Sequence, residues 1–85
     1  MQYVYVLFIE WADRGDTDTS IKVFADLEKA REELREYIED DKDWADSLYN
    51  KCENIDLEND LYEVWEDDDY TGEHSLAYIE KKKVL

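Results

Sequence analysis

Residues 26–55 read DLEKAREELREYIEDDKDWADSLYNKCENI. Apolar side chains recur in this stretch every three or four positions, which is the spacing of one face of an α-helix. These positions are Leu27, Ala30, Leu34, Ile38, Ala45, Leu48, Cys52 and Ile55. The pattern predicts an amphipathic helical segment whose apolar face packs against the rest of the chain.

Acidic side chains occupy the opposite face of the same predicted segment, because successive helical residues are rotated by about 100°. They are Glu28, Glu32, Glu36, Glu39, Asp43, Asp46 and Glu53. Most of the basic residues in the stretch flank this line of carboxylates and do not join it. One side of the segment is therefore predicted to face a core and the other to present a ridge of negative charge.

The start of the helical segment is marked by Asp26, whose carboxylate can accept hydrogen bonds from free amides of the first turn. Residues 40–43 read DDKD and interrupt the apolar stripe, with Asp41 at a position where a core residue is expected. Aspartate is a weak helix former. We therefore expect two helices, at about 26–40 and 43–54, with a kink at the aspartates; a single bent helix is the alternative.

Four segments have the composition of β-strands: 3–11 (YVYVLFIEW), 20–24 (SIKVF), 61–66 (LYEVWE) and 75–82 (SLAYIEKK). The first is apolar on both faces, which is typical of a central strand. Residues 12–19 form a polar loop in which Gly15 supplies a positive φ, so the first two strands make a hairpin. The order predicts one α+β domain over residues 1–85, with helices on one face of a four-stranded, mainly antiparallel sheet.

The formal charge of −15 limits the possible partners of the chain. Bare nucleic acid and anionic membranes are repelled by so much acid, whereas basic protein surfaces and divalent cations are attracted. No apolar run is long enough to cross a membrane, and the N-terminal residues lack a basic segment followed by a cleavage site. A single cysteine excludes an internal disulfide. We expect a cytoplasmic protein that binds neither nucleic acid nor membrane directly.

Nucleophilic catalysis would require a base close to the nucleophile. The chain has one histidine, His74, in an acidic turn, and one cysteine, Cys52, on the apolar stripe of the predicted helix. A buried, inert thiol is the usual outcome at such a position. We therefore expect no catalytic residues, no cofactor and no enzymatic activity.

Residues 67–72 read DDDYTG and resemble part of a calcium-binding loop. Asp67, Asp69, Thr71 and Gly72 fit its first, third, fifth and sixth positions, but the twelfth position, which needs a bidentate glutamate, is Tyr78. The flanking residues also indicate strands, whereas helices flank such loops. No metal site is predicted here, although calcium binding remains an alternative.

Two groups of acidic residues are the candidate binding surface. The first, called the acidic row below, consists of Glu32, Glu36, Glu39, Asp43 and Asp46. The second consists of Asp67, Asp68 and Asp69, with Tyr70 beside them as an aromatic contact. Charges one helical turn apart can imitate a phosphate backbone and steer the protein toward a basic surface. The alternative is that the charge only keeps a small protein soluble.

The segments YVYVLF, VFADLEKAREEL and YEVWED, followed by YTGEHSLAYIE, resemble small acidic ββαββ proteins of phages and mobile elements. Some acidic phage proteins of this kind are anti-CRISPR and other anti-defence factors that act as DNA mimics. The resemblance implies a phage-encoded, non-enzymatic inhibitor whose partner is the basic nucleic-acid-binding groove of a host protein such as a CRISPR effector. It carries over no functional residue. A structural or assembly module that forms homodimers is the remaining alternative.

Overall fold

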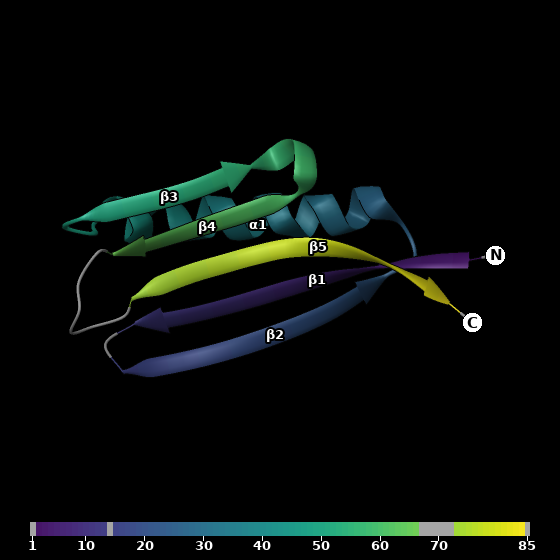
Figure 1. Ribbon diagram of the computed structural model, residues 1–85, viewed down its shortest axis with the longest axis horizontal. Helices are drawn as coiled ribbons and strands as arrows, with labels where there is room; N and C mark the ends of the chain where they lie inside the picture. The colour runs from purple at the N-terminus through teal and green to yellow at the C-terminus, as the bar shows by residue number, and fades with distance from the viewer. Residues whose placement is uncertain (1, 14, 67–72, 85) are drawn as a thin grey trace.

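The computed structural model describes residues 2–13, 15–66 and 73–84. Within these residues the elements are β1 (Gln2–Asp13), β2 (Asp16–Phe24), α1 (Leu27–Asp46), β3 (Lys51–Asp56), the 3₁₀ turn η1 (Leu57–Asn59), β4 (Leu61–Glu66) and β5 (His74–Val84). The strands form one antiparallel sheet in the order β2-β1-β5-β4-β3. Helix α1 runs along one face of this sheet (Figure 1). The α+β class and the antiparallel sheet are thus confirmed.

Strand β1 lies inside the sheet, as its apolar composition predicted, with β2 on one side and β5 on the other. Phe8 pairs with Ile21 of β2 and with Tyr78 of β5. The predicted hairpin between β1 and β2 is confirmed, and Gly15 has φ +88°. The predicted loop over residues 12–19 is wrong in length, because pairing continues to Asp13 and Asp16.

The core lies between α1 and the side of the sheet that faces it, which we call the covered face. Side chains from both layers are buried there: Leu7, Leu34, Ala45, Tyr62, Val64 and Ala77. Leu7 and Val64 are each 1% exposed, and they come from β1 and β4 on either side of β5. The apolar stripe of residues 27–45 therefore packs as the helical periodicity predicted.

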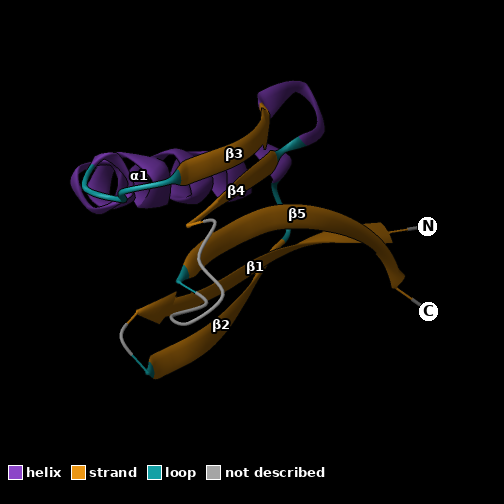
Figure 2. Ribbon diagram, turned by 60° about the vertical axis from the view of Figure 1, so that its left-hand side comes forward, coloured by secondary structure: helices purple, strands orange, loops and turns teal. Residues whose placement is uncertain are grey.

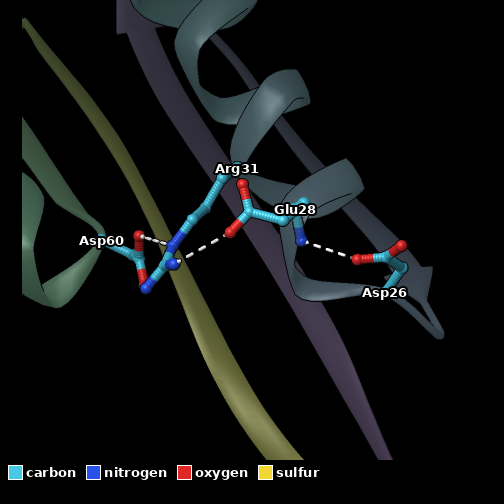
Figure 3. Close-up of polar contacts among 4 residues, drawn as sticks. All are labelled: Asp26, Glu28, Arg31 and Asp60. Carbon is cyan, nitrogen blue, oxygen red and sulfur yellow. Dashed lines mark hydrogen bonds and ion pairs between the residues drawn. The ribbon is translucent and has the colours of Figure 1, made fainter.

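Helix α1 begins after Asp26, whose Oδ1 accepts a hydrogen bond from the backbone N–H of Glu28 at 2.9 Å (Figure 3). The predicted N-cap is confirmed. The predicted break into two helices at residues 40–43 is wrong, because one continuous helix extends to Asp46, as in the alternative of a single helix. Asp41 is accommodated within this continuous helix, and Tyr62 of β4 donates a hydrogen bond to its carboxylate.

The second predicted helix, at 43–54, is also wrong in its last part. After Ser47 the chain turns, and Lys51–Asp56 forms the edge strand β3, which pairs with β4 from Lys51↔Glu66 to Asp56↔Leu61. The sheet consequently has five strands in the described part of the chain, where four were predicted, and it is covered by one helix. Pairing with β3 satisfies the backbone groups of β4 that would otherwise form a free edge.

An ion pair fastens the first turns of α1 to the loop before β4. Arg31 donates from Nε to Oδ1 of Asp60 at 2.8 Å and from a terminal nitrogen to Oδ2 at 3.3 Å, and it also contacts Glu28 (Figure 3). Asp60 has φ +56° and ends η1. Its backbone oxygen accepts a hydrogen bond from the N–H of Ile79 in β5. One residue thus joins the helix, the loop and the sheet.

Candidate functional site

The acidic row lies along the exposed side of α1, and two of its members, Glu39 and Asp46, also border a hollow that they share with β3 and β4. All five of its residues, Glu32, Glu36, Glu39, Asp43 and Asp46, are exposed. Their helical spacing was predicted, and the structure places them on one accessible surface.

Four of the five carboxylates in the acidic row form no ion pair with the described residues. Asp46 is the exception, since the Nζ of Lys51 lies 3.1 Å from its Oδ1. Other ion pairs of the helix involve Glu28 and Glu33, which lie beside the row. The described residues therefore leave most of the negative charge of the row without an ion-pair partner.

The spacing of these carboxylates carries a cost for the helix. Glu32 and Glu36 stand four residues apart, as do Glu39 and Asp43, so each pair lies on neighbouring turns. Like charges at this spacing destabilise a helix by about 0.2–0.5 kcal/mol per pair. Solubility alone does not require such an arrangement, because alternating signs on the surface serve it equally well.

The second predicted group, Asp67, Asp68 and Asp69 with Tyr70, lies outside the described residues, and so does most of the calcium-like loop. The residues on either side of it are described. The N–H of Glu66 donates to the backbone oxygen of Glu73 at 3.0 Å. The pKa of the Glu73 carboxyl is raised, first by a hydrogen bond with Glu66, then by desolvation and by the charges of Glu66 and Asp13. Acidic groups thus gather at this end of the sheet.

A pocket of about 240 Å³ lies between the end of β1 and the second half of α1. Its walls are Trp11, Asp13, Tyr37, Asp40, Asp41 and Trp44. We call it the Trp11–Trp44 pocket. It was not predicted from the sequence, since it depends on how strand and helix are set against each other. The signal that could have found it is an aspartate, Asp41, on the apolar side of the helix beside aromatic residues.

Hydroxyl groups form hydrogen bonds with two of the lining residues, Asp41 and Tyr37. The Tyr62 hydroxyl donates to Oδ2 of Asp41 at 2.8 Å, and the Tyr37 hydroxyl is hydrogen bonded to Oγ of the fully buried Ser75. Burial raises the pKa of Asp41, although hydrogen bonds from Tyr62 and Ser75 oppose this effect. Burial also raises the pKa of Tyr37 to about 12, and burial together with Asp41 raises that of Tyr62. The phenols therefore stay protonated near neutral pH.

A nucleophile–base pair is not formed by Cys52 and His74. Cys52 lies in edge strand β3 and not, as predicted, on a helix; it is partly exposed and its thiol is free. In the register of the sheet, Trp65 of β4 stands between Cys52 and His74. The Nε2 of His74 lies 2.9 Å from Oε1 of Glu10. In the described part of the chain, no group of three or more His, Cys, Asp or Glu side chains is arranged to hold a metal ion.

Comparison of the chain with protein-family models, with curated proteins and with solved structures gives no match. Among the described residues, no helix is both long and apolar enough to cross a membrane.

Proposed function

We propose that this protein is a non-enzymatic binding domain whose acidic row occupies a basic, nucleic-acid-binding groove of another protein. The observation that carries the proposal is the run of exposed carboxylates at Glu32, Glu36, Glu39 and Asp43, none of which forms an ion pair with a described residue. A large field of a single sign steers association with a surface of opposite charge.

The dimensions of the row support imitation of nucleic acid. Glu32 and Asp43 are eleven positions apart in one helix, which corresponds to about 16 Å at a rise of 1.5 Å per residue. Neighbouring carboxylates are separated by about 5.4 Å along the helix axis, which is of the same order as the roughly 3.4 Å of axis between successive phosphates of one DNA strand. A groove that is lined by lysine and arginine to bind phosphates would find a comparable series of anions on this helix.

The finer form of the proposal is a phage-encoded anti-defence factor, with a CRISPR effector as one class of target. It is supported by the resemblance of the strand and helix segments to small acidic phage proteins and by the net charge of −15. Such an inhibitor needs no catalytic group, because it acts by occupying the groove. Its association should be fast at low ionic strength and should slow as salt rises.

The experiment is a pull-down from bacterial lysate with the tagged protein at low and at high salt. The proposal expects capture of a nucleic-acid-binding protein that is lost at high salt. A double variant, Glu36→Lys with Asp43→Lys, should abolish capture. The matched control, Asp16→Lys with Glu58→Lys, makes the same change in net charge at two exposed positions off the helix and should still capture the partner. Equal capture by both double variants would overturn the proposal.

A second candidate function, a homodimeric assembly module, is favoured by the side of the sheet opposite α1. Strand alternation places on it Val4, Val6, Phe8, Ile21, Val23, Leu61, Trp65, Leu76 and Tyr78, and we call it the open face. Ile21 and Val23 are each 62% exposed, and Figure 2 shows the helix on the other side only. Contiguous apolar surface of this kind often marks an interface.

Sedimentation equilibrium separates the two candidates. An assembly module should form a dimer whose dissociation constant changes little with salt, and Ile21→Lys should convert it to a monomer. A monomer at both low and high salt would remove this candidate and would leave the acidic row as the binding surface.

A further inference from the structure

The Trp11–Trp44 pocket combines a concave shape with one kind of chemistry. Strand β1 provides Trp11 and Asp13, and helix α1 provides Tyr37, Asp40, Asp41 and Trp44. The described residues that line it are three aspartates, a tyrosine and two tryptophans, with no lysine or arginine among them. Its volume of about 240 Å³ is below the roughly 300–1,000 Å³ of sites for drug-sized ligands. It therefore suits a group the size of one side chain.

The carboxylates of this pocket lack a positive partner among the described residues. None of Asp13, Asp40 and Asp41 is within ion-pair distance of a described lysine, arginine or histidine. Asp41 is partly buried, and the hydrogen bond from Tyr62 fixes its position. Taking a carboxylate out of water is unfavourable unless a cation or hydrogen-bond donors accompany it. The Tyr62 hydroxyl supplies a hydrogen-bond donor to Asp41, and a cationic ligand would add the positive charge that the described residues do not place beside these carboxylates.

The negative potential continues beyond the pocket. A neighbouring hollow shares Asp13 and Trp44 with it and is also lined by Glu66 and Glu73. The pKa of Glu73 is raised first by a hydrogen bond with Glu66 and then by desolvation, and the negative charges of Glu66 and Asp13 add to the effect. A positive charge placed beside Asp13 would offset part of this negative charge.

The aromatic lining selects the kind of cation. A metal ion would be attracted by the carboxylates alone, but it gains nothing from two indole groups. An organic cation is attracted to aromatic rings, and tryptophan is the best of them. A guanidinium is planar, more weakly hydrated than an ammonium, and can bind a carboxylate through two parallel hydrogen bonds while it stacks on a ring.

We propose that the Trp11–Trp44 pocket binds the guanidinium group of an arginine side chain, supplied by the basic partner of the acidic row. The source of the arginine rests on the proposed function, whereas the chemistry of the pocket does not. Asp40 lines the pocket and lies one turn from Glu36 of the acidic row, so one surface of a partner could contact both the row and the pocket. Arginine and tryptophan are both enriched among interface hot spots, which lie in well-packed pockets.

The test uses the three tryptophan indole N–H signals in ¹⁵N-resolved NMR spectra of the full chain. Trp65 serves as an internal reference, because it lies on the open face, opposite Trp11 and Trp44. Titration with N-acetyl-arginine amide should shift the signals of Trp11 and Trp44 and leave that of Trp65 unchanged. The lysine analogue should bind more weakly, and the neutral citrulline analogue should produce no shift. Equal shifts of all three indoles, or equal effects of arginine and citrulline, would overturn the proposal.

Two variants locate the contact. Asp40→Asn alters an exposed side chain, so the fold should be retained, and it should weaken binding of the arginine amide by about fivefold, as expected for loss of one ion pair. The matched control Glu58→Gln also removes one negative charge from an exposed position but lies outside both the pocket and the acidic row, and its affinity for the arginine amide should remain within about twofold of wild type. If the two variants are equally weakened, the binding is general attraction to negative charge and the pocket assignment is wrong.

The failure of this proposal can be told apart from failure of the proposed function. If arginine amide shifts the Trp11 and Trp44 signals but no protein is captured from lysate, the pocket proposal is supported and the inhibitor role is contradicted. The opposite outcome is salt-sensitive capture of a basic protein that Asp40→Asn does not change and that does not shift the Trp11 and Trp44 signals. It would contradict the pocket proposal and support the acidic row as the binding surface.

Discussion

The hydroxyl of Tyr62 donates a hydrogen bond to Oδ2 of Asp41 across the interface between the sheet and the helix, at 2.8 Å. This contact explains how an aspartate can occupy the apolar side of α1. It also places the carboxylate at the wall of the Trp11–Trp44 pocket. The position has an energetic consequence, because burial raises the pKa of Asp41 above its ordinary value.

Asp41→Asn should make the protein more stable at pH 7. A raised pKa means that the folded protein holds the Asp41 proton more tightly than the unfolded chain does. The contribution of this group to stability is therefore present below its unfolded pKa of about 3.9 and is lost as the pH rises through the higher folded pKa. The asparagine oxygen can accept the same hydrogen bond from Tyr62 without a charge. We expect a gain of about 1 kcal/mol at most, since Asp41 is only partly buried.

Thermal unfolding followed by circular dichroism at pH 7 and at pH 4 checks this prediction. The difference between Asp41→Asn and wild type should shrink as the pH is lowered, because the folded protein takes up the Asp41 proton at a higher pH than the unfolded chain does. Glu36→Gln is the matched control, because it removes the same charge from an exposed position of the same helix. A loss of stability at pH 7 in Asp41→Asn would contradict the prediction.

Asp60→Asn should lower the melting temperature by a few degrees. Asparagine tolerates the left-handed backbone of this position, so the change removes the charge that faces Arg31 without adding backbone strain. Glu28→Gln removes the other carboxylate that contacts Arg31, but the Glu28 side chain is 69% exposed whereas that of Asp60 is 14% exposed. Its effect should be less than half as large, because exposed ion pairs contribute little. Equal effects in thermal melts would mean that burial does not distinguish the two pairs.

Gly15→Ala should destabilise the protein through the backbone alone. Gly15 has φ +88°, and a Cβ at this position would meet no atom within 4 Å. We expect a loss of about 1–2 kcal/mol, the cost of a left-handed conformation for an ordinary residue. Gly15→Asn should cost less, because asparagine adopts this conformation more readily. Urea denaturation of both variants measures the difference, and equal losses would point to a cause other than φ.

The parts of the fold that could be predicted are those with strong local signals. The run YVYVLFIEW indicated an interior strand, and β1 pairs on both sides. Asp26 before an apolar stripe indicated a helix start, and it caps α1. Gly15 indicated a turn, and it has a positive φ. In each case the residue type itself restricts the backbone, so a single sequence was enough.

Strand β3 could not be predicted because its residues fit two patterns. Cys52 and Ile55 continue the helical spacing of residues 27–48, yet the same segment alternates well enough to pair with β4. Residues 51–56 become a strand because they can pair with the edge of β4, which lies outside the segment itself. The predicted break in the helix failed for a similar reason, since the hydroxyl that accommodates Asp41 comes from Tyr62, distant in sequence.

One part of the candidate site could be predicted from the sequence and the other could not. The acidic row could be predicted because its members share one helix and follow its period. The Trp11–Trp44 pocket could not be, because Trp11 and Asp13 come from β1 and the other walls from α1. Only the packing of helix on sheet brings these side chains together.

The carboxylates of the acidic row should also determine how the stability of the fold responds to salt. At a net charge of −15, repulsion opposes compaction, so the melting temperature of the wild-type protein should rise between about 20 mM and 500 mM NaCl as the charges are screened. Glu36→Lys with Asp43→Lys should raise the melting temperature at low salt and reduce its dependence on salt. The first new lysine would stand four residues from both Glu32 and Asp40, and the second four residues from Glu39, so unfavourable pairs become favourable ones.

Differential scanning calorimetry of the wild type and the double variant across the salt series measures these changes. The matched control is again Asp16→Lys with Glu58→Lys, which changes the net charge equally but leaves the helical pairs as they are. The rise in melting temperature of this control at low salt should be smaller than that of the helix variant, because the control reduces only the general repulsion among the charges. If the helix variant were less stable than wild type at low salt, the acidic row would be stabilising the fold. The carboxylates would then not destabilise the helix, and binding would not be needed to explain their arrangement.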